Sequence, residues 1–334
     1  MNANPAVIPA PLELADIEAA RRRIAGYVRR TPVLTSEPLD AAAGASLFFK
    51  CENLQHIGAF KARGATNAVF ALGEAEAARG VATHSSGNHA AAVARAAGLR
   101  GAPAYIVMPE GSARPKVEQV ERLGGRITFC APTQTAREET AARIVAETGA
   151  VFIHPYDNAF VMAGQGTAAL ELLEDAPDLD LVLAPIGGGG LISGVSTAVK
   201  ALRPAARVIG CEPAGADDAA RSLAAGRLIP LERADTIADG LRASLAASTF
   251  AQIQRDVDAI ATVSEAGIVA AMRTLWEALK VVVEPSAAVP YAAILEGRIE
   301  TKGLRIGVIL TGGNVDLDRL PWIAGAAAVP TPKG

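Results

Sequence analysis

The sequence predicts an α/β protein with mostly parallel sheets flanked by helices. From Ser46 onward, short runs rich in β-branched and apolar residues alternate with helical patterns, which is typical of parallel sheets covered by helices. Half of the 334 residues are hydrophobic, so a large core is expected, but only 4% are aromatic. That core must therefore consist mainly of Ala, Val, Leu and Ile. The length allows two domains or one large one.

The expected strands are short and apolar: Leu47–Cys51, Val81–His84, Ala104–Val107, Ile127–Cys130, Val151–His154, Leu181–Pro185, Val208–Cys211, Ala259–Val263 and Arg305–Leu310. The expected helices carry apolar residues at helical spacing: Leu12–Arg29, Lys61–Leu72, Asn88–Ala97, Ala113–Leu123, Thr133–Thr148, Gly166–Leu173, Leu191–Leu202 and Glu265–Val281. Ligands in such folds bind at the carboxyl ends of the strands, so the turns after strands are where chemistry is expected.

Composition excludes several classes of protein. The net charge of −3, without a basic block or a basic-aromatic stripe, argues against nucleic acid as a partner. Cys51, Cys130 and Cys211 form no CxxC pair, so we expect buried thiols in a reducing compartment. The segment Met1–Pro11 lacks the pattern of a signal peptide, and no apolar run reaches the roughly 18 residues of a membrane span. We expect a soluble, cytoplasmic protein.

Lys61 lies where a predicted strand gives way to a predicted helix, in the stretch Gly58–Asn67, among small and apolar residues. An ammonium group removed from water has a lowered pKa, so part of it is a neutral amine that can condense with an aldehyde. The common alternative is a lysine at a helix start with its head in solvent. Three other turns favour the first interpretation.

The turn Thr83–His89 follows an apolar strand and opens an Ala-rich helix. Serines at a helix start cap free backbone N–H groups, and such a turn also binds an anion such as a carboxylate. Capping explains one serine, but it does not explain Asn88 together with His84 and His89. We therefore expect this turn to be functional.

Four glycines, Gly187, Gly188, Gly189 and Gly190, join the buried strand Leu181–Pro185 to a helix. Without side chains, the backbone can wrap closely around a ligand and point its N–H groups at phosphate oxygens. No Gly-Lys-Ser/Thr follows, which excludes a P-loop, and no third glycine completes GxGxxG. The turn therefore predicts a phosphate monoester held without a lysine.

Two further strand ends are polar. Thr311 opens a Thr-Gly-Gly-Asn turn after a strand, which is a weak signal by itself. Glu212, Asp217 and Asp218 follow another strand, and three carboxylates with a backbone carbonyl would suit a hard divalent cation. On spacing alone, a solvated acidic loop is the better interpretation.

An activated lysine amine, a phosphate cradle and polar strand ends together indicate pyridoxal 5'-phosphate, which offers an aldehyde to the lysine and a phosphate to the glycines. Each part alone is only suggestive, whereas the combination is specific. A non-catalytic binder of a phosphate ligand, using the same cradle, is the alternative from another class of protein.

These motifs resemble those of the serine/threonine dehydratase and serine racemase family, the fold-type-II pyridoxal phosphate enzymes. The resemblance runs from about Ile17 to Leu320 and is carried by seven stretches: Gly58–Ala65, Ser85–His89, His154–Asp157, Ala163–Thr167, Gly187–Gly190, Ala238–Gly240 and Thr311–Leu317. It implies the tryptophan-synthase-beta-like fold, with two lobes that each hold a mostly parallel sheet. The smaller lobe, residues 80–155, would be a mobile domain inserted into a cofactor-binding domain of residues 1–79 and 156–334.

The resemblance also implies roles for single residues. Lys61 would bind the cofactor covalently and then serve as the base that removes the substrate α-proton. Phe60 would pack against the cofactor ring, Asn88 would bond its hydroxyl, and Gly187–Gly190 would bind its phosphate. Thr311 would face the pyridine nitrogen and leave it largely unprotonated, which favours loss of a β-substituent over reactions that need a long-lived carbanion.

The substrate carboxylate would be held by the turn after the second predicted strand, namely by Ser85, Ser86, Gly87 and His89. Dehydratase-only members commonly have alanine where this chain has Ser86. In serine racemases that serine lies across the ring from the lysine and carries the second proton, as racemisation requires. Glu212, Ala216 and Asp218 match the racemase-type metal site, Ala216 through its carbonyl, which shifts the interpretation of the acidic loop toward Mg²⁺, Ca²⁺ or Mn²⁺.

The implied reaction is loss of water from a β-hydroxy amino acid to give a keto acid and ammonia via an imine, with L-serine, L-threonine and 3-hydroxyaspartate as candidate substrates. His84 and Arg137 match positions that line the substrate pocket, where a second carboxylate would need a cationic partner. Against this, Arg137 lies in a charged helical stretch, and a solvated helix face is the alternative. The sequence favours 3-hydroxyaspartate and serine almost equally as the substrate. The other hypothesis is a serine or aspartate racemase with elimination as a side activity. Relatives are commonly homodimers.

Overall fold

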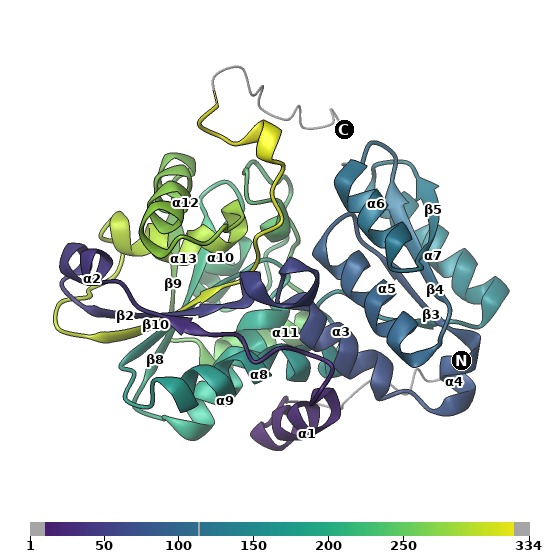
Figure 1. Cartoon of the computed structure of the whole chain (residues 1–334), viewed down its shortest axis with the longest axis horizontal. Coiled ribbons are helices and arrows are strands. Elements are labelled where there is room, and N and C mark those ends of the chain that lie inside the picture. Colours follow the sequence, from purple (N-terminus) through teal and green to yellow (C-terminus); the bar gives the residue numbers. More distant parts are fainter. Residues whose placement is uncertain (1–10, 113, 324–334) are drawn as a thin grey trace.

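The computed structural model describes residues 11–112 and 114–323. It has two units, each built around its own sheet (Figure 1). All but Pro11 of the segment Met1–Pro11, on which the prediction of no signal peptide rested, lies outside the described residues.

The larger unit contains a six-stranded sheet in the order β1-β2-β10-β7-β8-β9. β1 runs antiparallel to β2, and every other pair is parallel. The strands are β1 Val33–Leu34, β2 Ser46–Cys51, β7 Leu181–Pro185, β8 Arg207–Pro213, β9 Ala259–Val263 and β10 Arg305–Leu310. The sequence predicted all of these except the two-residue β1.

The second unit contains a four-stranded, fully parallel sheet in the order β5-β4-β3-β6. Its strands are β3 Val81–His84, β4 Ala104–Pro109, β5 Arg126–Cys130 and β6 Val151–Phe152. The predicted α/β fold with two mostly parallel sheets is therefore confirmed. The second sheet lies inside the range 80–155, while the domain boundaries and the mobility of this unit stay predictions.

Thirteen α-helices occur in the described residues: α1 Leu14–Ile24, α2 Glu37–Ala43, α3 Lys61–Phe70, α4 Glu74–Arg79, α5 Asn88–Arg100, α6 Arg114–Arg122, α7 Gln134–Thr148, α8 Ala159–Asp175, α9 Gly190–Leu202, α10 Asp218–Ala225, α11 Ala247–Asp256, α12 Glu265–Leu279 and α13 Pro285–Leu295. Short 3₁₀ turns are η1 Glu52–Leu54, η2 His56–Gly58, η3 Asp239–Leu241 and η4 Leu317–Arg319. None of the described helices is long and apolar enough to cross a membrane.

Two helices differ from their predicted bounds by more than three residues at one end. The first was expected to run to Arg29, but the chain leaves the helix at Ala25 and Gly26 adopts a φ of +81°. The helix α8 starts seven residues before the predicted Gly166, because the Asn158 side chain caps it by accepting a hydrogen bond from the Val161 backbone N–H at 3.0 Å.

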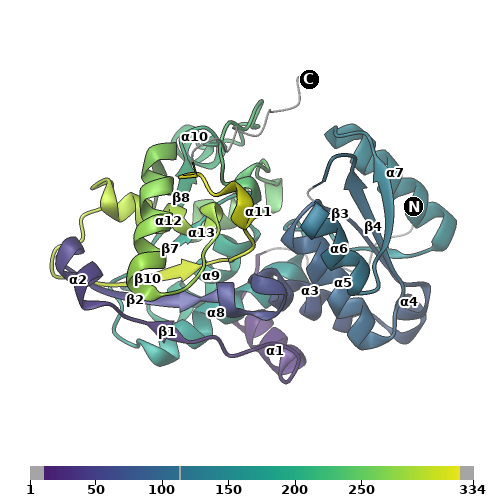
Figure 2. The same cartoon turned by 45° about the horizontal axis from the view of Figure 1, so that its top comes forward.

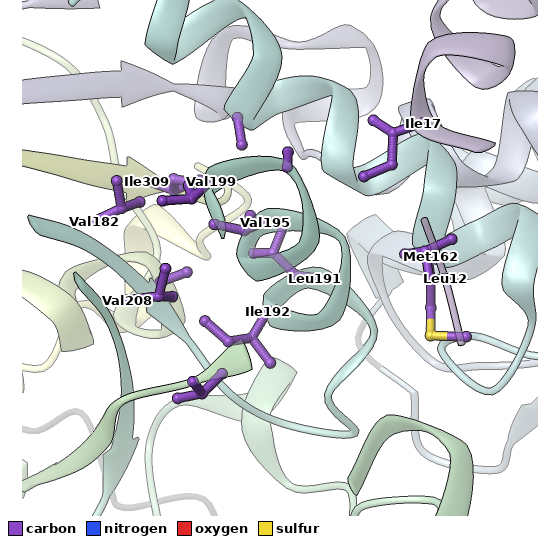
Figure 3. Packing of buried hydrophobic residues seen from close by; sticks show 14 of the residues in the cluster. Leu12, Ile17, Met162, Val182, Leu191, Ile192, Val195, Val199, Val208 and Ile309 are labelled. Atoms are coloured by element: carbon purple, nitrogen blue, oxygen red, sulfur yellow. The ribbon is translucent and has the colours of Figure 1, made fainter. Parts of the chain in front are cut away.

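The core of the larger unit lies on both faces of its sheet. On one face, Ile192, Val195 and Val199 of α9 pack against Val182, Val208 and Ile309 of the strands (Figure 3). The helices α8 and α9 approach closely through glycines: a Cβ on Gly194 would lie 2.3 Å from the Met162 carbonyl oxygen. The other face is covered by α12 and α13. Cys51, Cys130 and Cys211 are buried, free thiols, as predicted.

The helix α3 lies between the two units, packing against α8 on one side and α5 on the other (Figure 2). Its start is fixed by a buried ionic cluster. Arg63 bonds Glu52 at 2.7 Å and Glu171 at 2.7 Å, and Lys50 bonds Glu171 at 2.6 Å. Removing one partner would leave a buried charge uncompensated. The cluster therefore holds Lys61, two residues before Arg63, in a fixed position relative to the larger sheet.

Candidate active site

Lys61 is the first residue of α3, and its ammonium has little contact with water. Nζ donates a hydrogen bond of 2.7 Å to the Pro155 carbonyl and lies 5.1 Å from the centroid of the Phe60 ring. Burial lowers the pKa of Lys61 to about 8. A substantial fraction of the amine is thus neutral near physiological pH, as expected from the sequence.

The glycine turn Gly187–Gly190 packs against Tyr156, the residue that follows Pro155, and leads into the N-terminus of α9. A Cβ on Gly188 would lie 2.3 Å from the Tyr156 ring, and one on Gly190 would lie 2.9 Å from the Tyr156 backbone. Gly189 has a φ of +87°, in the left-handed region that favours glycine. Free N–H groups at a helix N-terminus and the absence of side chains make this turn a fitting cradle for a phosphate group.

Thr311 is buried at the carboxyl end of β10, and its carbonyl accepts a 3.0 Å hydrogen bond from the Phe60 backbone N–H. A bridge between Ala59 and Gly312 joins the same two segments. The structure thus brings Phe60, Lys61 and Thr311 together at one edge of the larger sheet.

Asn88, at the start of α5, is tied to this edge by a carboxyl group that sequence reasoning missed. Its amide nitrogen donates to Glu284 at 3.0 and 3.2 Å, and its amide oxygen accepts from Asn314 at 2.8 Å. Burial and the negative charge of Asp239 raise the pKa of Glu284 to about 7. The signal available in the sequence was an acidic residue between the apolar run Val281–Val283 and a helix-starting proline.

The turn between β3 and α5 holds Ser85 and Ser86 half-buried. Neither serine caps α5, contrary to one interpretation of the sequence; Gly87 occupies that position, and its N–H donates to the Ser85 hydroxyl at 3.3 Å. His89 is buried, with Nε2 3.1 Å from the Ile153 carbonyl, and its Nδ1 has no partner among the described residues. The hydroxyl groups of the turn therefore remain largely available to a ligand.

The far side of the turn is lined by neutral histidines and one cation. His84 lies 6.0 Å from His154 between ring centroids. Burial lowers the pKa of His84, and it lowers that of His154 to about 4. Arg137 adds to the lowering at His84, its side chain is half-buried, and its Nε is buried without a partner in the described chain. Any anion bound here would therefore find its positive charge on Arg137 rather than on His84.

The candidate cation ligands lie where α10 begins. Glu212 is buried and accepts hydrogen bonds from the Ala219 and Ala220 N–H groups at 3.2 and 2.9 Å, and Asp218 accepts from the Leu245 N–H at 3.0 Å. Neither carboxylate forms a salt bridge with another described side chain. The described residues hold no cluster of three or more His, Cys, Asp or Glu side chains suited to a metal, so a site here needs the Ala216 carbonyl as a third ligand.

A lysine of lowered pKa that bonds Pro155, with a glycine turn at a helix N-terminus packed against the adjacent Tyr156, fits a phosphate-bearing aldehyde. Residues 24–312 match the family model described as pyridoxal-phosphate dependent enzyme. The chain belongs to the fold-type-II family of pyridoxal-phosphate dependent enzymes.

Three relatives show how similar this chain is to known members. A beta-hydroxyaspartate dehydratase of Paracoccus denitrificans is 53% identical over 92% of this chain and 98% of its own length. A serine racemase of Arabidopsis thaliana is 50% identical, over 92% of this chain and 95% of that protein. The structure of maize serine racemase superimposes with a TM-score of 0.91 at 48% identity, covering 92% of this chain and 95% of the maize chain.

The residues around Lys61 fit pyridoxal phosphate as a resident cofactor. Gly187–Gly190 would take its phosphate and Asn88 its ring hydroxyl, while Phe60 would pack against the ring and Thr311 would face its nitrogen. The fit rests on two observations. The glycine turn leads into a helix N-terminus at positions where no side chain has room, and the Lys61 amine has a pKa lowered to about 8 with the Pro155 carbonyl as its hydrogen-bond acceptor.

Proposed function

We propose that this enzyme is a dehydratase that removes water from a β-hydroxy α-amino acid, with 3-hydroxyaspartate as its preferred substrate. The observation that carries the preference is Arg137, a half-buried cation beside His84 whose Nε lacks a partner in the described chain. A half-buried guanidinium with an unused Nε donor is suited to a carboxylate. The 53% identity to a beta-hydroxyaspartate dehydratase supports the same choice.

Bound pyridoxal phosphate supplies an electron sink next to the substrate α-carbon. Lys61 then acts as the base: its amine is buried, partly neutral near pH 8, and can accept the α-proton. Thr311 offers the ring nitrogen a neutral neighbour instead of a charged one, which suits elimination of the β-hydroxyl over longer-lived carbanion chemistry.

Substrate orientation would come from the turn between β3 and α5. Ser85, Ser86, Gly87 and His89 would hold the α-carboxylate. Arg137 would hold the β-carboxylate, and the neutral His84 beside it would supply a hydrogen bond rather than a charge. Closure of the smaller unit over the larger one would exclude water from this pocket.

The test is the initial rate of ammonia and keto acid formation by the cofactor-loaded enzyme on L-serine, L-threonine and each 3-hydroxyaspartate diastereomer. The proposal expects oxaloacetate and ammonia from one hydroxyaspartate isomer, with a kcat/KM at least about tenfold above that for serine or threonine. A clear preference for serine or threonine would contradict it.

A racemase is the second candidate, and Ser86 is the observation that favours it. Its hydroxyl lies in a turn whose serines do not cap the following helix, and relatives named serine racemases are 50% identical to this chain. If Ser86 carries the second proton, Ser86→Ala abolishes inversion at the α-carbon and spares elimination. Parallel loss of both activities would rule out this division of roles.

We also propose a divalent cation at Glu212, Ala216 and Asp218. Two buried carboxylates without a salt-bridge partner are a donor set that suits Mg²⁺, Ca²⁺ or Mn²⁺. Asp218 binds the backbone of Leu245, whose side chain lies 3.0 Å from the Cβ position of Gly189. The cation would therefore stabilise the phosphate cradle as well as the loop. A cytoplasmic homodimer is proposed with it, and light scattering on the purified protein tests the oligomeric state.

A further inference from the structure

Lys116 joins the two units directly over the substrate turn. It lies in the first turn of α6, which packs against α5 of the smaller unit. Its Nζ forms an ion pair with Asp239 of η3, which belongs to the larger unit and lies 123 positions further along the chain. The relative solvent exposure of the Lys116 side chain is 27%, so water screens the charge of this ion pair only in part.

The same ammonium lies against the turn that would hold the substrate carboxylate. The Cβ position of Gly87 is 3.9 Å from Nζ, and that ammonium is the nearest group outside the local chain. On the other side, Asp239 is followed by Gly240, whose N–H donates to the Ser286 hydroxyl at 3.0 Å and whose carbonyl lies 3.0 Å from the Cβ position of Gly187. The ion pair therefore connects the substrate turn with the first glycine of the phosphate cradle.

Asp239 is the ion-pair partner of this ammonium, and Glu284 acts on it as a second, more distant acidic group. Burial works to lower the pKa of Lys116, but Asp239 and Glu284 raise it above its ordinary value, so the ammonium stays charged. Glu284 in turn holds the Asn88 amide. Because its ammonium is already paired with Asp239, we assign Lys116 to the link between the two units and not to direct contact with the substrate.

We propose that Lys116 is a positioning residue: its ion pair with Asp239 holds the Ser85–His89 turn against the phosphate cradle and thereby keeps the enzyme in its substrate-binding conformation. This inference rests on the proposed role of that turn. Without the pair, the turn would be in its binding position in a smaller fraction of molecules. The apparent affinity for substrate is proportional to that fraction, so it would fall as well.

The experiment compares Lys116→Met, Asp239→Asn and the charge-exchanged double variant Lys116→Glu/Asp239→Lys with the wild-type holoenzyme. Arg114→Met is the matched control, because Arg114 lies on the same helix and its ion pair with Glu118 is exposed. Steady-state kinetics give KM and kcat on the best substrate of the wild type. Amide hydrogen exchange of residues 85–89, measured without substrate, gives an independent readout.

Each single variant should raise KM by about 3- to 10-fold, change kcat by less than about twofold, and speed exchange in the turn. The double variant should restore most of the wild-type KM and most of the wild-type exchange rate. Arg114→Met should change neither of these two quantities. Failure of the double variant to recover would overturn the proposal, as would an Asp239→Asn enzyme that binds substrate and exchanges like the wild type. Because exchange is measured without substrate, it tests the tether even if the substrate assignment proves wrong.

Discussion

The contact between Gly188 and Tyr156 gives a sharp test of the phosphate cradle. A methyl group at Gly188 would have three atoms of the Tyr156 ring at 2.3, 2.4 and 2.5 Å as its nearest neighbours. Ordinary contacts begin near 3.4 Å, so the ring or the turn must move by about 1 Å. The helix α9 and the strand β7 on either side are buried and leave little room for adjustment.

The expected cost follows from overpacking. Inserting a methyl group into a close-packed site costs about 1–3 kcal/mol, which corresponds to about 5- to 150-fold weaker cofactor binding. Gly188 has no positive φ, so the alanine backbone itself is not strained. Equilibrium titration of the cofactor-free protein with pyridoxal phosphate, followed by absorbance, measures the dissociation constant of Gly188→Ala directly.

The clash has one source, which allows a double-mutant test. Tyr156→Ala removes the ring, so Gly188→Ala should weaken binding much less in that background than in the wild type. Gly98→Ala is the control, because its nearest neighbour would be the Leu123 carbonyl oxygen at an ordinary 3.6 Å. Wild-type affinity in Gly188→Ala, or an unchanged penalty in the Tyr156→Ala background, would refute the reasoning.

Four further predictions follow from the same structure. The rate of pyridoxal phosphate association with the cofactor-free enzyme should rise with pH around a midpoint of about 8 and level off roughly one pH unit higher, as Lys61 loses its proton; a stopped-flow rate still rising steeply at pH 10 would contradict the lowered pKa. Arg63→Met should lower the free energy of unfolding by about 3–5 kcal/mol in urea, because buried Glu52 loses its ion-pair partner and Glu171 keeps only Lys50. Millimolar Mg²⁺ or Ca²⁺ should raise the melting temperature of the wild type but not of Glu212→Gln or Asp218→Asn; equal shifts in all three would remove the cation site. Chiral chromatography of L-serine incubated with Ser86→Ala should detect no D-serine while ammonia release continues.

The local patterns of the sequence were sufficient to predict the sheets. Strand–helix alternation reflects burial on both faces of a parallel sheet, so the runs at β7 and β10 carried an unmistakable apolar signal. The two-residue strand β1 was not predicted, because so short a run shows no alternation of apolar and polar residues. The early start of α8 at Ala159 escaped as well, because the Asn158 cap is a single side chain ahead of a glycine-containing segment.

Two parts of the candidate site could be predicted from the sequence. Gly187–Gly190 stand out as four consecutive glycines after a buried strand, and Lys61 stands out as a lysine among small and apolar residues. Glu284 and Lys116 were missed, and Asp239 was recognised only as part of the stretch Ala238–Gly240 without a role, because the importance of all three arises from tertiary contacts. Nothing in the local sequence indicates that a lysine of α6 and a carboxylate of η3 meet across the two units. Arg137 shows the same limit, since its charged helical neighbours conceal the buried Nε.

The most direct test of the proposed substrate is the specificity ratio of Arg137→Gln, defined as kcat/KM for 3-hydroxyaspartate divided by kcat/KM for L-serine. Arg143→Gln is the control, because Arg143 lies on the same helix with an exposed ion pair to Glu147. The account predicts that Arg137→Gln lowers the ratio by about 10- to 100-fold while Arg143→Gln leaves it unchanged. An unchanged ratio in Arg137→Gln would contradict a second-carboxylate site at this arginine.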